Sequence, residues 1–251
     1  VLAAVTNPDR PKGRGRKLAS SPVKEKAQAL KLPVIQPESV NDARLQTELT
    51  ALAPDLFIVV AFSVLPKALL AVPRIGSINL HPSLLPAYRG AAPIVWAVAN
   101  GEQETGISTF LLNPRVDAGD ILMQRRIAIA PDETAGQLEA RLCLLGADMV
   151  LETVDSLENG SLTPLPQNCC GVTRAPKLSK EDGRIDWSQS AVLINNRIRG
   201  FNPFPGAFTT LAGQPLKVHR AQPTEGTGTP GQVIQADARN GLLVALSLIH
   251  I

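Results

Sequence analysis

A short segment of the chain carries polar side chains whose types could support acyl transfer. It reads SINLHP at 77–82 and begins as an apolar, strand-like run. Because residues two apart in a strand point to the same side, Asn79 and His81 are expected to project together from the carboxyl end of that strand. Open α/β sheets hold their ligands at this end of the strands. The segment therefore predicts an active site around Asn79 and His81.

A carboxylate follows another strand-like run further along the chain. Asp117 lies in VDAGD at 116–120, next to Gly119, which lets the backbone bend close to a neighbour. Asn79 and a protonated His81 can donate hydrogen bonds to the oxyanion of a tetrahedral intermediate, and a nearby carboxylate orients the imidazole and favours its protonated form. One such oxyanion donor contributes about 3 kcal/mol. These three residues suit transfer of an acyl group to an amine, because the amine is itself the nucleophile.

Each of these residues also has an ordinary structural interpretation. An Asn or Asp at a strand end is commonly a turn-former or a helix cap, and a single His is commonly a satisfied polar residue. Ser83 could be a serine nucleophile, but it lacks the glycine-flanked elbow that exposes such a serine. The chemistry therefore depends on the three residues meeting.

The surrounding pattern predicts an α/β fold for the first part of the chain. Apolar, β-rich runs at 1–5, 55–61, 75–80 and 106–112 alternate with segments of helical period, which implies a parallel sheet with crossover helices. The run 55–61 is expected to be a buried central strand. Helices are expected after Ser21, which can cap free amides, near Pro93, and over 132–159.

The chain changes character after about residue 160. Residues 160–180 have the proline- and serine-rich composition of a linker or a wrapping segment. Beyond them, short β-like runs at 208–211, 216–219, 232–235 and 242–246 are separated by Gly/Pro turns, which is typical of a small barrel or sandwich. Because the chain begins on what reads as a second strand and ends inside a strand, we expect a fragment that lacks both ends.

Composition and local sequence argue against a membrane-spanning, a secreted or a metal-binding protein. A hydrophobic fraction of 44% and a charged fraction of 19% over 251 residues are typical of a soluble globular protein. The longest apolar run, 56–62, is far shorter than the roughly 20 residues of a spanning helix, and no secretory signal is visible. The three cysteines have no metal-ligand spacing, so we expect reduced thiols and no metal ion. A net charge of +3 does not by itself indicate nucleic-acid binding.

Taken in order, the motifs resemble those of the formyltransferases that use 10-formyltetrahydrofolate. They are Asn-x-His at 79–81, SLLP at 83–86, RGAAP at 89–93, ETG at 104–106 and DAGD at 117–120. The resemblance implies a Rossmann-like formyltransferase domain in which Asn79, His81 and Asp117 are catalytic. It also implies that 10-formyltetrahydrofolate is the co-substrate and contacts Ser83, Leu84, Leu85, Pro86, Phe62 and Leu65.

A basic run near the start of the chain points to a nucleic-acid partner. Five cations, Arg10, Lys12, Arg14, Arg16 and Lys17, lie in a loop broken by glycine and proline, and such loops suit phosphate backbones. A solvated charge run is the ordinary alternative. Together with SPVK at 21–24, the loop resembles the tRNA-contacting loop of methionyl-tRNA formyltransferases. This resemblance implies initiator methionyl-tRNA as the partner, with Arg14 as its main contact to the acceptor stem.

The segments APKLSKEDGRIDW at 175–187 and IRGFNPFPG at 198–206 are similar to the joint before the OB-like barrel of the same family. The resemblance implies a catalytic domain at 1–172 without its first strand and helix, a joint at 173–206, and a truncated OB-like β-barrel at 207–251. It implies a cytoplasmic, monomeric enzyme of translation initiation that formylates the methionyl amine and does not bind membranes. Two other functions stay open, namely a formyltransferase acting on a small amine such as an aminosugar or nucleotide, and a non-catalytic folate- or RNA-binding module.

Overall fold

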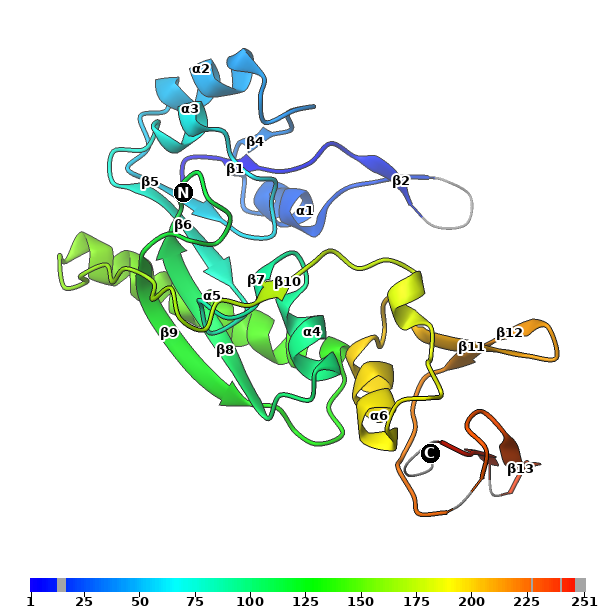
Figure 1. The fold of residues 1–251 in the computed structure, drawn as a ribbon. Helices are drawn as coiled ribbons and strands as arrows, with labels where there is room; N and C mark the ends of the chain where they lie inside the picture. Colours follow the sequence, from blue (N-terminus) through cyan, green and yellow to red (C-terminus); the bar gives the residue numbers. More distant parts are fainter. Residues whose placement is uncertain (13–16, 227, 240, 247–251) are drawn as a thin grey trace. The chain divides into compact units, whose positions relative to one another are not determined.

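The structure is a computed structural model that describes residues 1–12, 17–226, 228–239 and 241–246 (Figure 1). It divides into two compact units. Unit 1 is Val1–Leu80 with Phe110–Asp120, and unit 2 is His81–Thr109 with Ile121–Ile251. Within the described residues, no helix is long and apolar enough to cross a membrane.

Unit 1 contains two pairs of parallel strands. Strand β1 (Ala4–Val5) pairs with β4 (Val34–Ile35), and β5 (Leu56–Val59) pairs with β6 (Gly76–His81) in a register that sets Val59 opposite Asn79. The helices are α1 (Pro22–Ala29), α2 (Ala43–Ala51) and α3 (Lys67–Leu70). Helix α1 begins as predicted, since the Ser21 hydroxyl accepts from the Lys24 amide at 3.1 Å.

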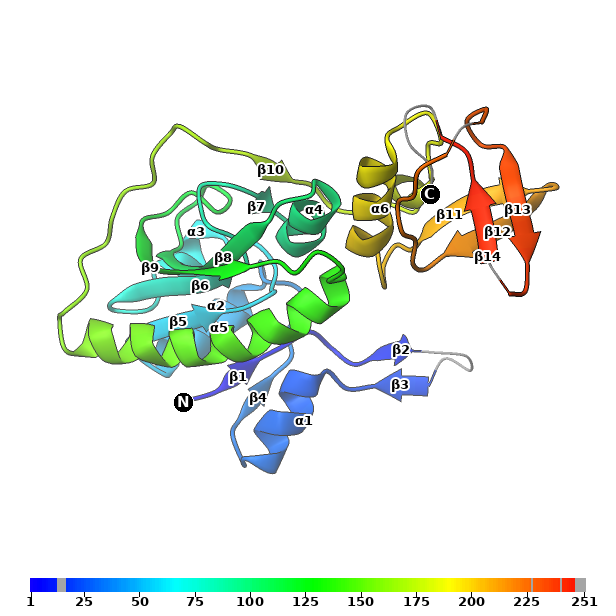
Figure 2. The same cartoon turned by 90° about the horizontal axis from the view of Figure 1, so that it is seen from below.

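The basic run expected as a loop contains a short antiparallel hairpin at its base. Strand β2 (Arg10–Lys12) pairs with β3 (Lys17–Ala19) (Figure 2). Asp9, just before the hairpin, is bonded to the Lys24 ammonium at 2.7 Å and to the Gln36 amide at 3.0 Å. The Lys24 and Gln36 bonds lower the pKa of the Asp9 carboxyl. Asp9 therefore links the base of the hairpin to α1 and to the end of β4.

The largest sheet has four strands in the order β5-β6-β8-β9, where β8 is Glu104–Leu111 and β9 is Ile121–Ala128. The backbone bonds from Leu111 to Asp120 and from Ile129 to Gln103, both 2.9 Å, pair β8 and β9 in opposite directions. The prediction of a buried central strand at 55–61 is wrong. Strand β5 is at the end of the sheet order, and Ile58 is 49% exposed.

Unit 2 has three α-helices among its described residues, namely α4 (Pro93–Ala99), α5 (Ala135–Glu158) and α6 (Ala191–Gly200), and a 3-10 turn at Glu181–Gly183. The long helix α5 begins with a capping box formed by Thr134 and Gln137. Its inner face buries Leu138, Leu142 and Met149, as its periodicity predicts.

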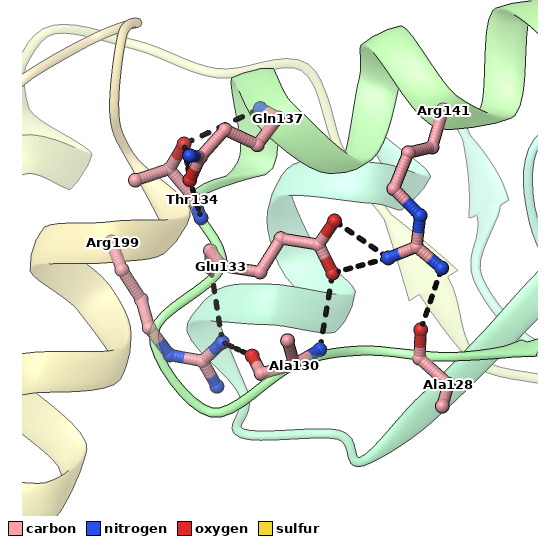
Figure 3. A network of polar contacts seen from close by, with 7 residues as sticks. All are labelled: Ala128, Ala130, Glu133, Thr134, Gln137, Arg141 and Arg199. Atoms are coloured by element: carbon pink, nitrogen blue, oxygen red, sulfur yellow. Dashed lines mark hydrogen bonds and ion pairs between the residues drawn. The ribbon is translucent and has the colours of Figure 1, made fainter.

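Figure 3 shows how the start of α5 is tied to α6. The buried Glu133 carboxylate accepts from the Arg141 guanidinium at 2.6 Å and from the Ala130 amide at 3.1 Å. Arg199 of α6 donates to the main-chain oxygen of Glu133 at 3.2 Å. Burial lowers the pKa of the Arg199 guanidinium. Because Arg199 donates to the main-chain oxygens of both Ala130 and Glu133, helix α6 is attached to the loop before α5.

The segment predicted as a linker or wrapping segment is partly ordered by pairing. Strand β10 (Arg174–Ala175) lies parallel to β7 (Arg89–Gly90). Gly90 has φ +126°, and a Cβ at this position would lie 2.4 Å from the Ala175 carbonyl oxygen. Only glycine fits here, so β7 and β10 can approach closely.

The end of the described chain forms two hairpins rather than a closed barrel (Figure 2). Strand β11 (Ala207–Leu211) pairs with β12 (Gln214–Val218), and β13 (Val233–Asp237) pairs with β14 (Gly241–Val244). One hydrophobic core joins α6 to β11 and to the residues after β14, and it contains Ala191, Ile194, Ile198, Ala207 and Leu246. The small sheets are consistent with a truncated OB-like domain.

Candidate active site

Two of the three predicted catalytic residues line one pocket of unit 1. Asn79 of β6 and Asp117 border it together with Phe62 and Leu65, two of the residues predicted to contact folate. The pocket has a volume of about 70 Å³, and Val59, Val64 and Leu112 add further apolar walls. An apolar pocket with a few polar groups is the usual form of a small-molecule site.

Asn79 lines this pocket, and its side-chain amide has unused hydrogen-bonding capacity. Its Oδ1 atom is buried and has no hydrogen-bond partner among the residues that the structure describes. A buried polar atom without a partner costs about 1–3 kcal/mol, so native structures rarely keep one without a reason. The Nδ2 group of the same amide can donate to an oxyanion.

Asp117 reaches the pocket through a tight turn between β8 and β9. Its φ is +48°, a left-handed conformation that aspartate tolerates better than most residues, and the residue is 9% exposed. A Cβ on Gly119 would lie 1.6 Å from the Leu111 carbonyl oxygen. The glycine in the DAGD motif is therefore required by close backbone contact.

His81, the third predicted catalytic residue, is the first residue of unit 2 and is 5% exposed. Its Nε2 atom lies 2.9 Å from the main-chain oxygen of Tyr88. Because a carbonyl oxygen can only accept, the proton of this bond belongs to Nε2. The alternating pattern of the strand placed His81 at the end of β6, but it gave no indication of the Tyr88 contact.

The predicted folate residues that follow His81 are held by a cluster of polar contacts around the buried Ser108. Ser108 of β8 is fully buried, and its hydroxyl donates to the Ser83 main-chain oxygen at 2.6 Å. The same hydroxyl accepts from the Leu85 amide at 3.2 Å and from the Gln124 side chain at 2.8 Å. We call Ser83, Leu85, Ser108 and Gln124 the Ser108 cluster. Sequence reasoning missed Ser108 and Gln124, although a Ser inside an apolar strand is a signal of such a role.

The Ser83–Pro86 turn has little freedom within unit 2. The Ser83 hydroxyl is buried and donates to the Ala87 main-chain oxygen at 2.6 Å. Leu85 is also buried, while Leu84 and Pro86 are partly exposed. The hydroxyl of Ser83 is thus committed to holding the turn.

The predicted tRNA-binding residues are only partly described. Arg10 is exposed on β2. Lys12 is the last residue of β2 and Lys17 is the first residue of β3, and their backbones pair with each other. Arg14 and Arg16 lie outside the described residues.

Comparisons with known proteins agree with the sequence motifs. The formyl transferase family model matches residues 1–154, and the model of the formyl transferase C-terminal domain matches residues 177–247. A methionyl-tRNA formyltransferase of Geobacter metallireducens is 49% identical over 245 residues, which is 97% of this chain and 78% of that protein. One of Myxococcus xanthus is 46% identical over 246 residues, which is 98% of this chain and 78% of that protein.

Solved structures with lower sequence identity share the fold. WlaRD, a sugar 3N-formyl transferase, has a TM-score of 0.71 at 17% identity, covering 99% of this chain and 85% of its own. HypX from Aquifex aeolicus, solved with tetrahydrofolic acid, has a TM-score of 0.65 at 21% identity and covers 88% of this chain and 39% of its own. The two family models and the high identity over nearly the whole chain show that this protein belongs to the formyl transferase family.

Proposed function

We propose that this protein transfers the formyl group of 10-formyltetrahydrofolate to the α-amino group of methionine carried by initiator tRNA, for translation initiation. The observation that carries the proposal is an identity of 46–49% to methionyl-tRNA formyltransferases over 97–98% of the chain. The buried Asn79 amide oxygen has no partner among the described residues, and it belongs to a pocket that Arg115 and Asp117 also line, which supports a site for a reacting carbonyl and amine.

The chemistry is a direct transfer between two nitrogen atoms. The methionyl amine forms a bond to the formyl carbon, the bond from that carbon to N10 of the folate breaks, the amine loses one proton and N10 gains one. In our proposal, Asn79 and a protonated His81 donate hydrogen bonds to the oxyanion of the tetrahedral intermediate, and Asp117 favours the protonated form of His81 and helps to relay the proton from the amine to N10. No covalent enzyme intermediate is needed.

Binding roles are assigned to two further groups of residues. We propose that Phe62, Leu65 and the turn at 83–86 contact the folate, because Phe62 and Leu65 share a pocket with Asn79 and Asp117. Arg10, Lys12, Arg14, Arg16 and Lys17 are proposed to contact the phosphates of the tRNA.

We further propose a catalytic domain at 1–172, a joint at 173–206 and an OB-like domain from 207. The family models, which match residues 1–154 and 177–247, support this division. We also propose that the protein acts in the cytoplasm as a monomer, away from membranes.

A formylation assay tests the proposal with initiator and elongator methionyl-tRNA side by side. We expect the initiator tRNA to be formylated much faster. Asn79→Ala and Asp117→Ala should each lower kcat by roughly 100-fold or more while circular dichroism stays unchanged. Asn41→Ala, which changes an exposed asparagine of the same unit, is the matched control. Near-normal rates in both variants would refute the site, and formylation of a free aminosugar in preference to tRNA would refute the substrate.

A further inference from the structure

The bond between His81 and Tyr88 has a chemical consequence for the imidazole. A neutral imidazole carries its single proton on one of two nitrogens, and the partner of each nitrogen decides which one. The Tyr88 main-chain oxygen, 2.9 Å from Nε2, can only accept a hydrogen bond. The neutral ring therefore keeps its proton on Nε2, and Nδ1 is the nitrogen that gains and loses a proton.

The position of that carbonyl oxygen depends on an unusual backbone conformation. Tyr88 has φ +58°, in the left-handed region. This conformation costs a residue with a Cβ about 1–2 kcal/mol, and bulky residues rarely adopt it. Such a conformation persists where the surrounding structure determines it, and it is found most often at functional sites.

Three bonds fix Tyr88 in this conformation. Its amide donates to the Thr173 hydroxyl at 2.8 Å. Its phenol donates to the Glu102 carboxylate at 2.6 Å and accepts from the Asn100 side chain at 3.2 Å. Burial, and then the bond to Glu102, raise the pKa of the phenol to about 12, so the phenol remains a donor at neutral pH. Tyr88 is therefore anchored through both its main chain and its side chain.

Arg89 and Gly90, the next two residues, also contact the segment that contains Thr173. The Arg89 amide donates to the Thr173 main-chain oxygen at 3.0 Å, and the Arg89 guanidinium donates to the Gln167 side chain at 2.6 Å. Gly90 packs against Ala175 too closely for any side chain. The turn at 88–90 is thus held by the segment 167–175, and its conformation leaves the Tyr88 carbonyl directed at His81.

We propose that Tyr88 is a positioning residue for His81: its main-chain oxygen holds the neutral imidazole in the Nε2–H tautomer, so that Nδ1 is the nitrogen that carries the second proton of the protonated ring and donates to the oxyanion during formyl transfer. The importance of this for catalysis rests on the proposed function, since His81 is there assigned a role in the reaction. The tautomer itself is a property of the protein and is measurable without substrate.

The tautomer can be read directly by nitrogen NMR of the ¹⁵N-histidine-labelled protein. The chain has three histidines, and replacing His219 and His250 with Gln leaves the signals of His81 alone. At a pH where the ring is neutral, we expect Nε2 to carry the proton and Nδ1 to show the shift of an unprotonated nitrogen. A neutral ring protonated on Nδ1 would overturn the proposal.

Two substitutions of Tyr88 separate the backbone conformation from the loss of the side chain. Tyr88→Gly and Tyr88→Val both remove the ring and its bonds to Glu102 and Asn100. Glycine adopts a left-handed φ freely, whereas a β-branched residue strongly disfavours it. We expect the Gly variant to keep the Nε2–H tautomer with kcat within about 3-fold of the parent. The Val variant should populate both tautomers and lose roughly 10-fold or more in kcat, with the KM values nearly unchanged.

Circular dichroism identifies a variant that fails to fold. If Tyr88→Gly or Tyr88→Val does not fold, Tyr88→Phe, which removes only the hydroxyl, takes its place. Its loss of kcat is expected to be smaller than the roughly 10-fold expected for Tyr88→Val, with a detectable Nδ1–H population. If the Gly and Val variants have the same kcat and the same populations of the two His81 tautomers, Tyr88 has no positioning role. If His81→Asn keeps full activity while the parent shows Nε2–H, the tautomer assignment stands and the proposed function fails at His81.

Discussion

The Ser108 cluster gives a quantitative prediction about the folate site. Ser108→Ala removes one hydroxyl that donates to the Ser83 main-chain oxygen and accepts from the Leu85 amide and the Gln124 side chain. Gln124 keeps a bond to the Leu85 main-chain oxygen at 2.9 Å. The substitution therefore leaves two buried main-chain groups, the oxygen of Ser83 and the amide of Leu85, without their partner.

The expected loss of stability follows from these two groups. Each buried main-chain group without a partner costs about 1–3 kcal/mol, so the free energy of unfolding should fall by about 2–4 kcal/mol after some relaxation. Because the same turn is proposed to contact the folate, we expect the KM for 10-formyltetrahydrofolate to rise roughly 10-fold, which corresponds to about 1.4 kcal/mol of binding free energy. The kcat value at saturating folate should change little.

A neighbouring hydroxyl on the same strand provides a matched control. Thr109 is also fully buried, points to the opposite face of β8, and bonds to the Thr153 hydroxyl at 2.9 Å. Thr109→Val removes this hydroxyl at nearly constant volume, and Thr153 keeps its bond to the Met149 main-chain oxygen. We expect a loss of about 1 kcal/mol in stability and no change in the KM for folate.

Urea denaturation and steady-state formylation kinetics measure both quantities for the two variants. We expect only Ser108→Ala to change the KM for folate, and we expect its loss of stability to be larger than that of Thr109→Val. An unchanged KM together with a stability loss no greater than that of Thr109→Val would show that the Ser108 cluster does not hold the folate turn.

Three further predictions concern other parts of the molecule. Replacing Arg14 and Arg16 with Glu should weaken initiator tRNA binding steeply and flatten its dependence on salt, measured by filter binding; equal affinity and salt slope would contradict the tRNA role. Tyr88 is the only tyrosine, so alkaline titration of phenolate absorbance should give a midpoint near its pKa of about 12 in the folded protein and near 10 in denaturant; identical midpoints would refute its anchoring. Its raised pKa means that stability falls as the pH rises from 10 towards 12. Glu133→Gln should lower the free energy of unfolding by about 1–2 kcal/mol and leave kcat unchanged, and an unaltered urea midpoint would disprove the importance of its charged bonds.

Much of the fold follows from local patterns in the sequence. The Ser21 cap, Pro93 at the start of α4 and the apolar stripe of α5 are local signals, and the structure confirms the helices they predict. Strand β9 was missed because Gln124, Arg125 and Arg126 interrupt its apolar run. The exposure of β5 could not be predicted, since an apolar run looks the same in a central strand and in an edge strand.

The candidate site was predictable only where strand geometry determines the direction of a side chain. Alternation along β6 indicated Asn79, the motif with Gly119 indicated Asp117, and both residues line one pocket. The Tyr88 carbonyl and the Ser108 hydroxyl could not be assigned, because their roles depend on main-chain groups that any residue carries. Pairings between distant segments, such as β7 with β10, leave no local pattern.

The division of the chain into two units restricts how this protein can be dissected genetically. The polypeptide passes from one unit to the other at 80/81, 109/110 and 120/121, so no single cut releases either unit whole. A product that stops at residue 109 would still encode Asn79 but would lack the pocket wall formed by 112–117. Deletion experiments on this protein therefore need internal joins rather than simple truncations, and a stop codon within β8 would remove part of both units.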